Sequence, residues 1–208
     1  MVTIFDEIVY AVSYLALSLV SLNCLTIYVM QVRSDARSYG YGIFIINAVY
    51  GVGGAISTVA DHLSHVQVIF YVAQVAFVLP LLATEVWIQN NMMPKQQELV
   101  YVPFVLGLLP FFSFIMMGHI RIDLIELCLV YCCVSICYVG CSTKDYMVVS
   151  ASLLFYLAYN MHYRGKVKIS NVLFILFVVC SLGSICPNCI ENWMKKSDFP
   201  FENNRRFK

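Results

Sequence analysis

The sequence predicts an all-α polytopic membrane protein, a bundle of about seven transmembrane helices. The chain of 208 residues is 61% hydrophobic and 12% charged, whereas a soluble domain carries about 25% charged residues. Its apolar residues gather in continuous stretches of about twenty, the length at which a helix crosses the hydrocarbon core of a bilayer. These blocks lack the alternation with a period of two that is typical of a transmembrane β-barrel.

The expected spans follow one another along the chain with short loops between them. They cover residues 7–31, 40–60, 66–88, 99–118, 122–141, 145–162 and 167–186. Asp6 and Glu7 precede the apolar run that begins at Ile8, where a cleavable signal peptide would carry basic residues, so we expect the first span to be retained as a helix. Residues 1–190 then form one seven-helix transmembrane domain, and residues 191–208 form a polar tail.

The distribution of Lys and Arg predicts the orientation of the bundle. One side of the membrane receives the larger set: Arg33, Arg37, Lys95, Lys144, Lys195, Lys196, Arg205, Arg206 and Lys208. The other side receives Arg121, Arg164, Lys166 and Lys168. We therefore expect a cytosolic C-terminus, although the basic loop from Arg164 to Lys168 argues for the opposite orientation. The last four residues loosely resemble a dibasic retrieval signal, which favours the endoplasmic reticulum over the plasma membrane.

Polar side chains within the spans are few, and they are the first places to look for function. Asn47 and Gln74 are expected to form hydrogen bonds between helices. Glu85 lies close enough to a span end to reach the interface. Glu126 lies about one turn inside the fifth span, where a carboxylate needs a proton, a cation or a water-filled cavity.

All four histidines fall at the ends of even-numbered spans or just beyond them. In a seven-span bundle these ends share one membrane face. The candidate binding residues there are His62, His65, His119 and Glu126, and Asp61 lies beside them. Such a cluster suits Zn²⁺ or general acid-base catalysis without a metal. Because Asp61-His62-x-x-His65 is no zinc signature and interfacial loops are ordinarily polar, we predict no metal.

The nine cysteines form two groups. One lies within the fifth span, where we expect the thiols to pack as small apolar side chains: Cys128, Cys132, Cys133, Cys137 and Cys141. The other is the pair Cys186 and Cys189 at the end of the seventh span. The thioredoxin-like pattern of a redox motif is missing, so we interpret this pair as palmitoylation sites beside the membrane.

The sequence also excludes several partners and cofactors. It contains no basic stripe, so no nucleic acid is expected. It contains no Walker loop, no G-x-S-x-G and no H-E-x-x-H, and we predict no cofactor. The expected partners are membrane lipids.

Three short elements occur in an order that resembles the lysoplasmalogenase (YhhN-like) family of membrane hydrolases. Val59-Ala60-Asp61-His62 closes the second span, where the family has Gly-Asp-Ala. Leu129-Val130-Tyr131 resembles its central Val-Tyr element. The run from Ser150 to Phe155 resembles the start of its Gly-Ala-x-x-Phe-x-x-Ser-Asp element. The similarity extends from about residue 42 to residue 186.

The resemblance implies a lysophospholipid substrate whose vinyl-ether bond is hydrolysed to release an aldehyde. It implies Asp61 as the acid that protonates the alkene carbon. The chain departs from the family in having seven expected spans in place of eight, Ala60 before the acid, and Leu157 and Ala158 where the family has Ser-Asp. Asn160, after a two-residue slip, and His162 are the candidates to replace the second acid.

Three classes of function therefore stand beside one another. The first is a lipid hydrolase similar to the lysoplasmalogenases, with the candidate catalytic residues Asp61, Asn160 and His162. The second is a non-enzymatic receptor-like or scaffolding protein whose polar residues only pack. The third is a pathway for a small solute or ion past Glu85 or Glu126.

Overall fold

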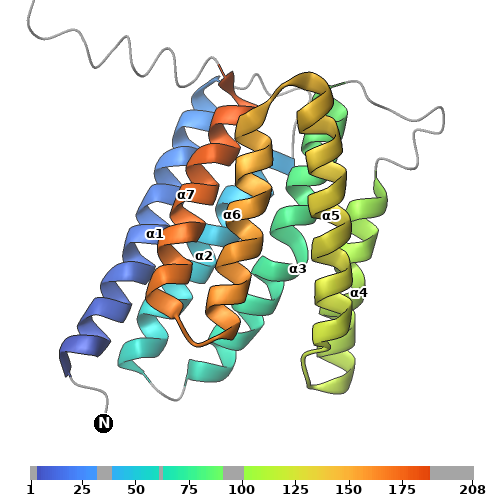
Figure 1. Cartoon of the computed structure of the whole chain (residues 1–208). Helices are drawn as coiled ribbons and strands as arrows, with labels where there is room; N and C mark the ends of the chain where they lie inside the picture. Colours follow the sequence, from blue (N-terminus) through green and yellow to red (C-terminus); the bar gives the residue numbers. More distant parts are fainter. Residues whose placement is uncertain (1–3, 32–38, 61–62, 91–100, 188–208) are drawn as a thin grey trace, which may run out of the picture.

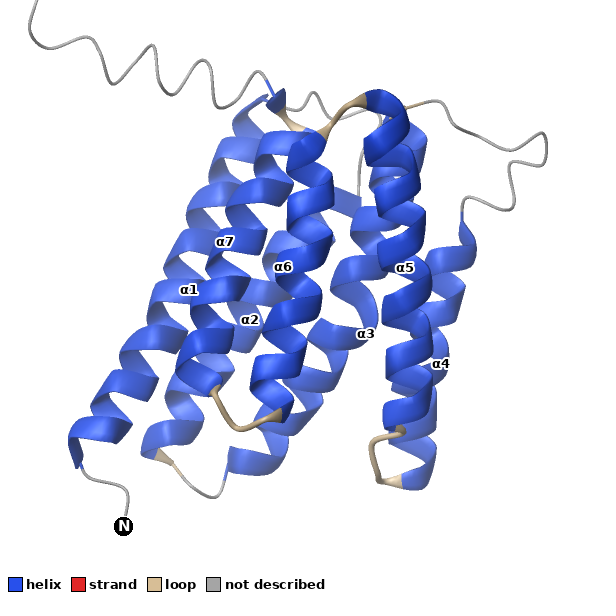
Figure 2. Cartoon of the chain, viewed as in Figure 1, coloured by secondary structure: helices blue, strands red, loops and turns tan. Residues whose placement is uncertain are grey.

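The computed structural model describes residues 4–31, 39–60, 63–90 and 101–187. Within these ranges the chain forms helices joined by short turns, and it contains no strand (Figure 2). The helices are α1 (Ile4–Gln31), α2 (Tyr39–Val59), α3 (Ser64–Gln89), α4 (Val102–Met117), α5 (Ile122–Thr143), α6 (Tyr146–Tyr163) and α7 (Val167–Ile185).

The predicted helical bundle is confirmed, and each helix lies within a few residues of its expected span. Five of the seven helices are long and apolar enough to cross a membrane. The other two are α4 and α6. Helix α4 has 16 residues, and at 1.5 Å per residue it reaches about 24 Å, short of the roughly 30 Å hydrocarbon core. Helix α6 has 18 residues and several polar side chains near its C-terminal end.

The helices form an open arc that α3 closes. Helix α1 packs against α2 and α7, α7 packs against α6, α6 packs against α5, and α3 lies between α2 and α5. Helix α3 contacts five other helices, and α4 lies outside this arrangement against α3 and α5 (Figure 1). A side chain on the inward face of α3 is therefore enclosed from several directions.

Three connections lie at one end of the bundle, drawn at the bottom of Figure 1 and called here the lower end. They join α2 to α3, α4 to α5 and α6 to α7. Gly118 and Gly165 end α4 and α6 there with positive φ angles of 69° and 74°, which glycine adopts without strain. At the upper end Asp145 caps α6, its Oδ1 accepting hydrogen bonds from the backbone N–H groups of Met147 and Val148 at 3.1 and 3.3 Å.

The contact between α3 and α4 depends on an interrupted helix. Pro80 has no N–H, so it cannot donate to the carbonyl of Ala76 one turn earlier in α3. Gly107 of α4 lies against that carbonyl, and a Cβ at this glycine would come within 2.2 Å of the Ala76 oxygen. The backbones of α3 and α4 thus approach each other closely where a side chain on α4 would prevent it.

Large apolar side chains cover the outside of the bundle as well as its core. Every helix exposes several of them, such as Leu19, Ile45, Phe112, Leu127 and Leu176. The fully buried residues include aromatic side chains between α6 and α7, where Phe155 stacks edge-on against Phe174 and Phe177. An apolar exterior around all seven helices is what a lipid environment requires.

Candidate functional site

Of the three histidines that the structure describes, His162 is the one that other helices partly enclose. It lies in the last turn of α6, and its ring stacks on Tyr71 of α3 with the ring centroids 4.0 Å apart and the planes 20° apart. Its Nδ1 lies 3.4 Å from the hydroxyl oxygen of Tyr50 of α2, a long hydrogen bond. Three helices thus place an imidazole between two phenols inside an apolar bundle.

Further aromatic side chains surround Tyr50, which is completely buried. Tyr14 of α1 packs edge-on against its ring with the centroids 5.5 Å apart, and Phe174 of α7 does so at 6.1 Å. We call Tyr14, Tyr50, Tyr71, His162 and Phe174 the aromatic cluster. It draws one residue from each of five helices, and its polar atoms are three phenol hydroxyls and one imidazole.

Two small residues make room for this cluster. A Cβ at Gly54 would lie 2.3 Å from the Tyr14 ring, and a Cβ at Gly51 would lie 2.7 Å from the backbone oxygen of Tyr14. The glycine run in the second span therefore permits the close approach of α1 that brings Tyr14 to Tyr50.

The other candidate histidines that the structure describes do not join His162. His65, in the first turn of α3, is exposed. His119 is exposed in the turn between α4 and α5, with its Nδ1 3.1 Å from the carbonyl oxygen of Met117. Asp61 and His62 lie outside the described residues. Although the helix ends share one face as expected, the described part of the chain contains no group of three His, Cys, Asp or Glu that could hold a metal ion.

Asn160 and Glu126 also lie apart from the aromatic cluster. The Asn160 amide donates to the carbonyl oxygen of Tyr156 in its own helix at 2.9 Å. Two residues along a helix correspond to a rotation of about 200°, so Asn160 and His162 lie on opposite faces of α6. Glu126 is exposed on the outside of α5.

Polar side chains next to the aromatic cluster continue into the bundle. Gln74 of α3 is completely buried and donates through Nε2 to Oδ1 of Asn47 at 2.8 Å. This is the expected hydrogen bond between helices, which here joins α2 to α3. Glu85 is equally buried near the other end of α3, where its Oε1 accepts from Gln89 at 3.2 Å.

The tyrosines of the cluster were not among the predicted site residues. The spacing did contain a signal. Asn47 and Tyr50 are three residues apart in α2, while Gln67, Tyr71 and Gln74 are separated by four and three residues in α3. Such spacing places the polar groups of each helix on one face.

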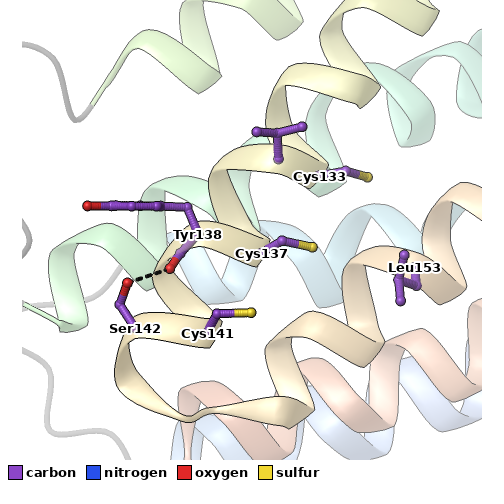
Figure 3. Close-up of a pocket in the computed structure, with 7 residues that line it drawn as sticks. Cys133, Cys137, Tyr138, Cys141, Ser142 and Leu153 are labelled. Atoms are coloured by element: carbon purple, nitrogen blue, oxygen red, sulfur yellow. Dashed lines mark hydrogen bonds between the residues drawn. The ribbon is translucent and has the colours of Figure 1, made fainter.

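The fifth-span cysteines divide between the core and the surface. Cys128 and Cys132 are buried, as the packing interpretation expects. Cys133, Cys137 and Cys141 line an open groove of about 610 Å³ between α5 and α6, and their sulfur atoms point toward Leu153 (Figure 3). The Cys137 sulfur lies 3.6 Å from the hydroxyl oxygen of Ser152. The groove is almost entirely apolar and opens on the outer surface.

Cys186 takes part in a disulfide bond, whereas the seven other cysteines that the structure describes are free thiols. The interpretation of Cys186 as a palmitoylation site was therefore wrong, because a sulfur in a disulfide carries no thiol to acylate.

Comparison with known protein families, with characterised proteins and with solved structures gave no match to this chain. The resemblance to the lysoplasmalogenases thus depends on the short elements quoted above and stays a prediction.

Proposed function

We propose that this protein is a membrane-embedded lipid hydrolase that cleaves the vinyl-ether bond of a lysophospholipid, in the manner of the lysoplasmalogenases. The observation that supports the proposal is the position of His162. An ionisable side chain inside a membrane bundle is expensive to bury and is therefore a functional candidate. Its stacking on Tyr71 and its contact with Tyr50 hold the ring in one orientation.

The chemistry needs an acid and a base close to the lower end of the bundle. Asp61 directly follows Ala60, the residue after the end of α2, and α2 and α6 both end at the lower end (Figure 1). In the proposed reaction Asp61 donates a proton to the alkene carbon farther from the ether oxygen. Water then attacks the resulting oxocarbenium carbon while His162 accepts its proton. The hemiacetal collapses to an aldehyde and a glycerophosphodiester, whose former ether oxygen takes the hemiacetal proton and becomes a free hydroxyl.

The test is aldehyde release from a lysoplasmalogen by the purified full-length protein in lipid nanodiscs. We expect Asp61→Asn to abolish release, because an amide cannot protonate carbon. His162→Phe keeps an aromatic ring against Tyr71 but removes the base, and we expect a loss of about a hundredfold or more. The matched control is His119→Phe, which changes an exposed histidine and should leave the rate unchanged.

Two outcomes contradict the proposal. A wild-type protein that releases no aldehyde excludes this activity for the substrate used. Release at the same rate from the saturated alkyl-ether analogue would show that the assay detects some other reaction. If His162→Phe and His119→Phe behave alike, the activity stands but the imidazole has no part in it.

A non-enzymatic scaffold is the second candidate, and specific observations favour it. Ala158 is completely buried where the related family has an acid. The carbonyl oxygen of Ala158 accepts a hydrogen bond from Ser170 at 2.8 Å, so this part of α6 packs directly against α7. The amide of Asn160 is used within its own helix. A wild-type protein that releases no aldehyde in the assay would favour the scaffold over the hydrolase.

The solute or ion pathway receives less support. Glu126 lies on the outer surface, and Glu85 is separated from Gln74 along α3 by the completely buried residues Val78, Leu79 and Leu82. The residues of α3 between the Gln74 amide and the Glu85 carboxylate are apolar apart from Thr84, whose hydroxyl donates to the carbonyl oxygen of Pro80 at 3.0 Å.

For the location we propose the endoplasmic reticulum with a cytosolic C-terminus, on the basis of the Lys and Arg distribution and the basic tail. The disulfide at Cys186 is the observation against this orientation, because disulfides persist mainly in oxidising compartments. A glycosylation acceptor site fused to the C-terminus distinguishes a cytosolic from a lumenal C-terminus. It stays unmodified if the C-terminus is cytosolic and is glycosylated if the C-terminus is lumenal.

A further inference from the structure

Polar residues meet at successive levels between the antiparallel helices α2 and α3, and we call these levels the polar rungs. Asn47 bonds to Gln74. One turn closer to the lower end, Tyr50 lies against Tyr71 with the ring centroids 6.1 Å apart. At the next turn Gln67 lies beside Gly53, where its Oε1 is 3.4 Å from the position of a Cβ.

The rungs reach the middle of the membrane. Gln74 is the eleventh residue of α3, which begins at Ser64 at the lower end. Ten residues of helix correspond to about 15 Å, half of the roughly 30 Å hydrocarbon core. Carboxamides at this depth are costly unless every polar atom is satisfied.

Several polar atoms of the rungs are not satisfied by the protein. In the described part of the chain, Oε1 of the completely buried Gln74 has no hydrogen-bond partner. Both Nε2 and Oε1 of Gln67 are buried without a hydrogen bond of good geometry, and this side chain interacts more loosely with the Tyr14 hydroxyl. Buried donors and acceptors of this kind are ordinarily bonded to ordered water.

The unpaired atoms are all uncharged amide groups, and they include both a donor and acceptors. They match water, which donates and accepts, better than an anion or a metal cation. The polar rungs end at Gln74. The next pair of residues toward the upper end is Ile43 and Val78, both completely buried. A dry aliphatic layer there leaves no route to the opposite face.

We propose that a dead-end column of internal water runs along the polar rungs from Gln67 at the lower end to Gln74 at the middle of the membrane. The column passes Tyr50, Tyr71 and His162. This inference goes beyond the proposed hydrolase, because such water is expected whether or not the protein cleaves a lipid. If the hydrolase proposal holds, the column also supplies the water that the reaction consumes.

Radiolytic hydroxyl-radical footprinting of the full-length protein in nanodiscs tests this inference, because radicals formed from a bound water oxidise the aromatic rings beside it. We expect oxidation of Tyr71 and Tyr14, whose neighbours include the unpaired amides. The matched controls are Phe155 and Phe177, which are completely buried between apolar side chains and should stay unmodified.

A double variant provides the second arm of the test. Gln67→Leu with Gln74→Leu keeps the approximate side-chain size but removes the groups that hold water, so oxidation of Tyr71 should be lost. Gln89→Leu, at the upper end of α3, should leave that oxidation unchanged. If Tyr71 and Tyr14 of the wild type are oxidised no more than Phe155, the water column is refuted. A positive footprint together with a silent aldehyde assay would overturn only the proposed hydrolase.

Discussion

The lower and upper halves of the α2–α3 interface have the same antiparallel geometry and opposite chemistry. In the lower half the two helices meet through Asn47 and Gln74 and through Tyr50 and Tyr71. In the upper half Gly42 of α2 lies against Leu81 of α3, and the completely buried residues of α3 are mainly aliphatic, such as Val78 and Leu82, with Thr84 and Glu85 closer to its end. Hydrocarbon tails are as apolar as these side chains, so the upper half is held by close packing. The lower half gains hydrogen bonds but leaves acceptors for water.

The two halves should respond differently to a change of side-chain volume. A dry half depends on shape, and any loss of volume there leaves a cavity. A polar half tolerates changes of volume better, because water can fill a site with polar partners. The following variants test the contrast, starting with the largest expected effect.

Leu79→Ala should destabilise the dry half most. Leu79 is completely buried, and truncation leaves a cavity among its neighbours. We expect the free energy of unfolding in detergent micelles to fall by about 2–4 kcal/mol. Leu109→Ala is the control, because Leu109 is 54% exposed on the lipid-facing surface. Equal losses in the two variants would mean that Leu79 is not enclosed.

Gly51→Ala should cost about 1–3 kcal/mol of unfolding free energy, because the new Cβ cannot fit without moving a helix. It would lie 2.8 Å from the backbone nitrogen of Ser18 in α1. The matched control on the same helix is Gly42→Ala, whose Cβ meets the mobile end of Leu81 at 2.9 Å. Thermal unfolding of both variants compares them directly. A Gly42 variant as unstable as the Gly51 variant would contradict the close contact of α1 and α2.

Gln74→Leu should change stability little. The variant loses the hydrogen bond to Asn47, which is worth about 0.6 kcal/mol on average between membrane helices, but it also removes an unpaired acceptor. A double-mutant cycle with Asn47→Leu measures the coupling between the two side chains. A coupling energy well above that average would show that the polar half is held mainly by this bond and not hydrated.

Asp6→Asn should have the smallest effect. Asp6 accepts from Nζ of Lys168 at 2.8 Å, and both side chains are partly exposed at the lower end. Such ion pairs contribute a few tenths of a kcal/mol and weaken with added salt. Unfolding measured at low and high salt should differ more for the wild type than for the variant. If the wild type and the variant differ in unfolding free energy by the same amount at low and high salt, the ion pair is not the cause of that difference.

The sequence predicted the elements of this fold well and the site only in part. The seven helices were predictable because each is a continuous apolar stretch, and in five of them the length and apolarity are those that a bilayer requires. The order of the helices correctly predicted that His65, His119 and His162 lie at the same end of the bundle. Their burial did not follow, since His162 is enclosed while His65 and His119 are exposed.

The sequence by itself determined the helical class, the number of helices and the end of the bundle at which the polar residues lie, because these depend on local hydrophobicity and chain order. Only the tertiary structure decided which side chains meet. The helices are apolar on all sides, so their pattern does not say which face turns inward. Tyr50 and His162 are 112 residues apart in the chain, and they meet because α2 and α6 both pack against α3.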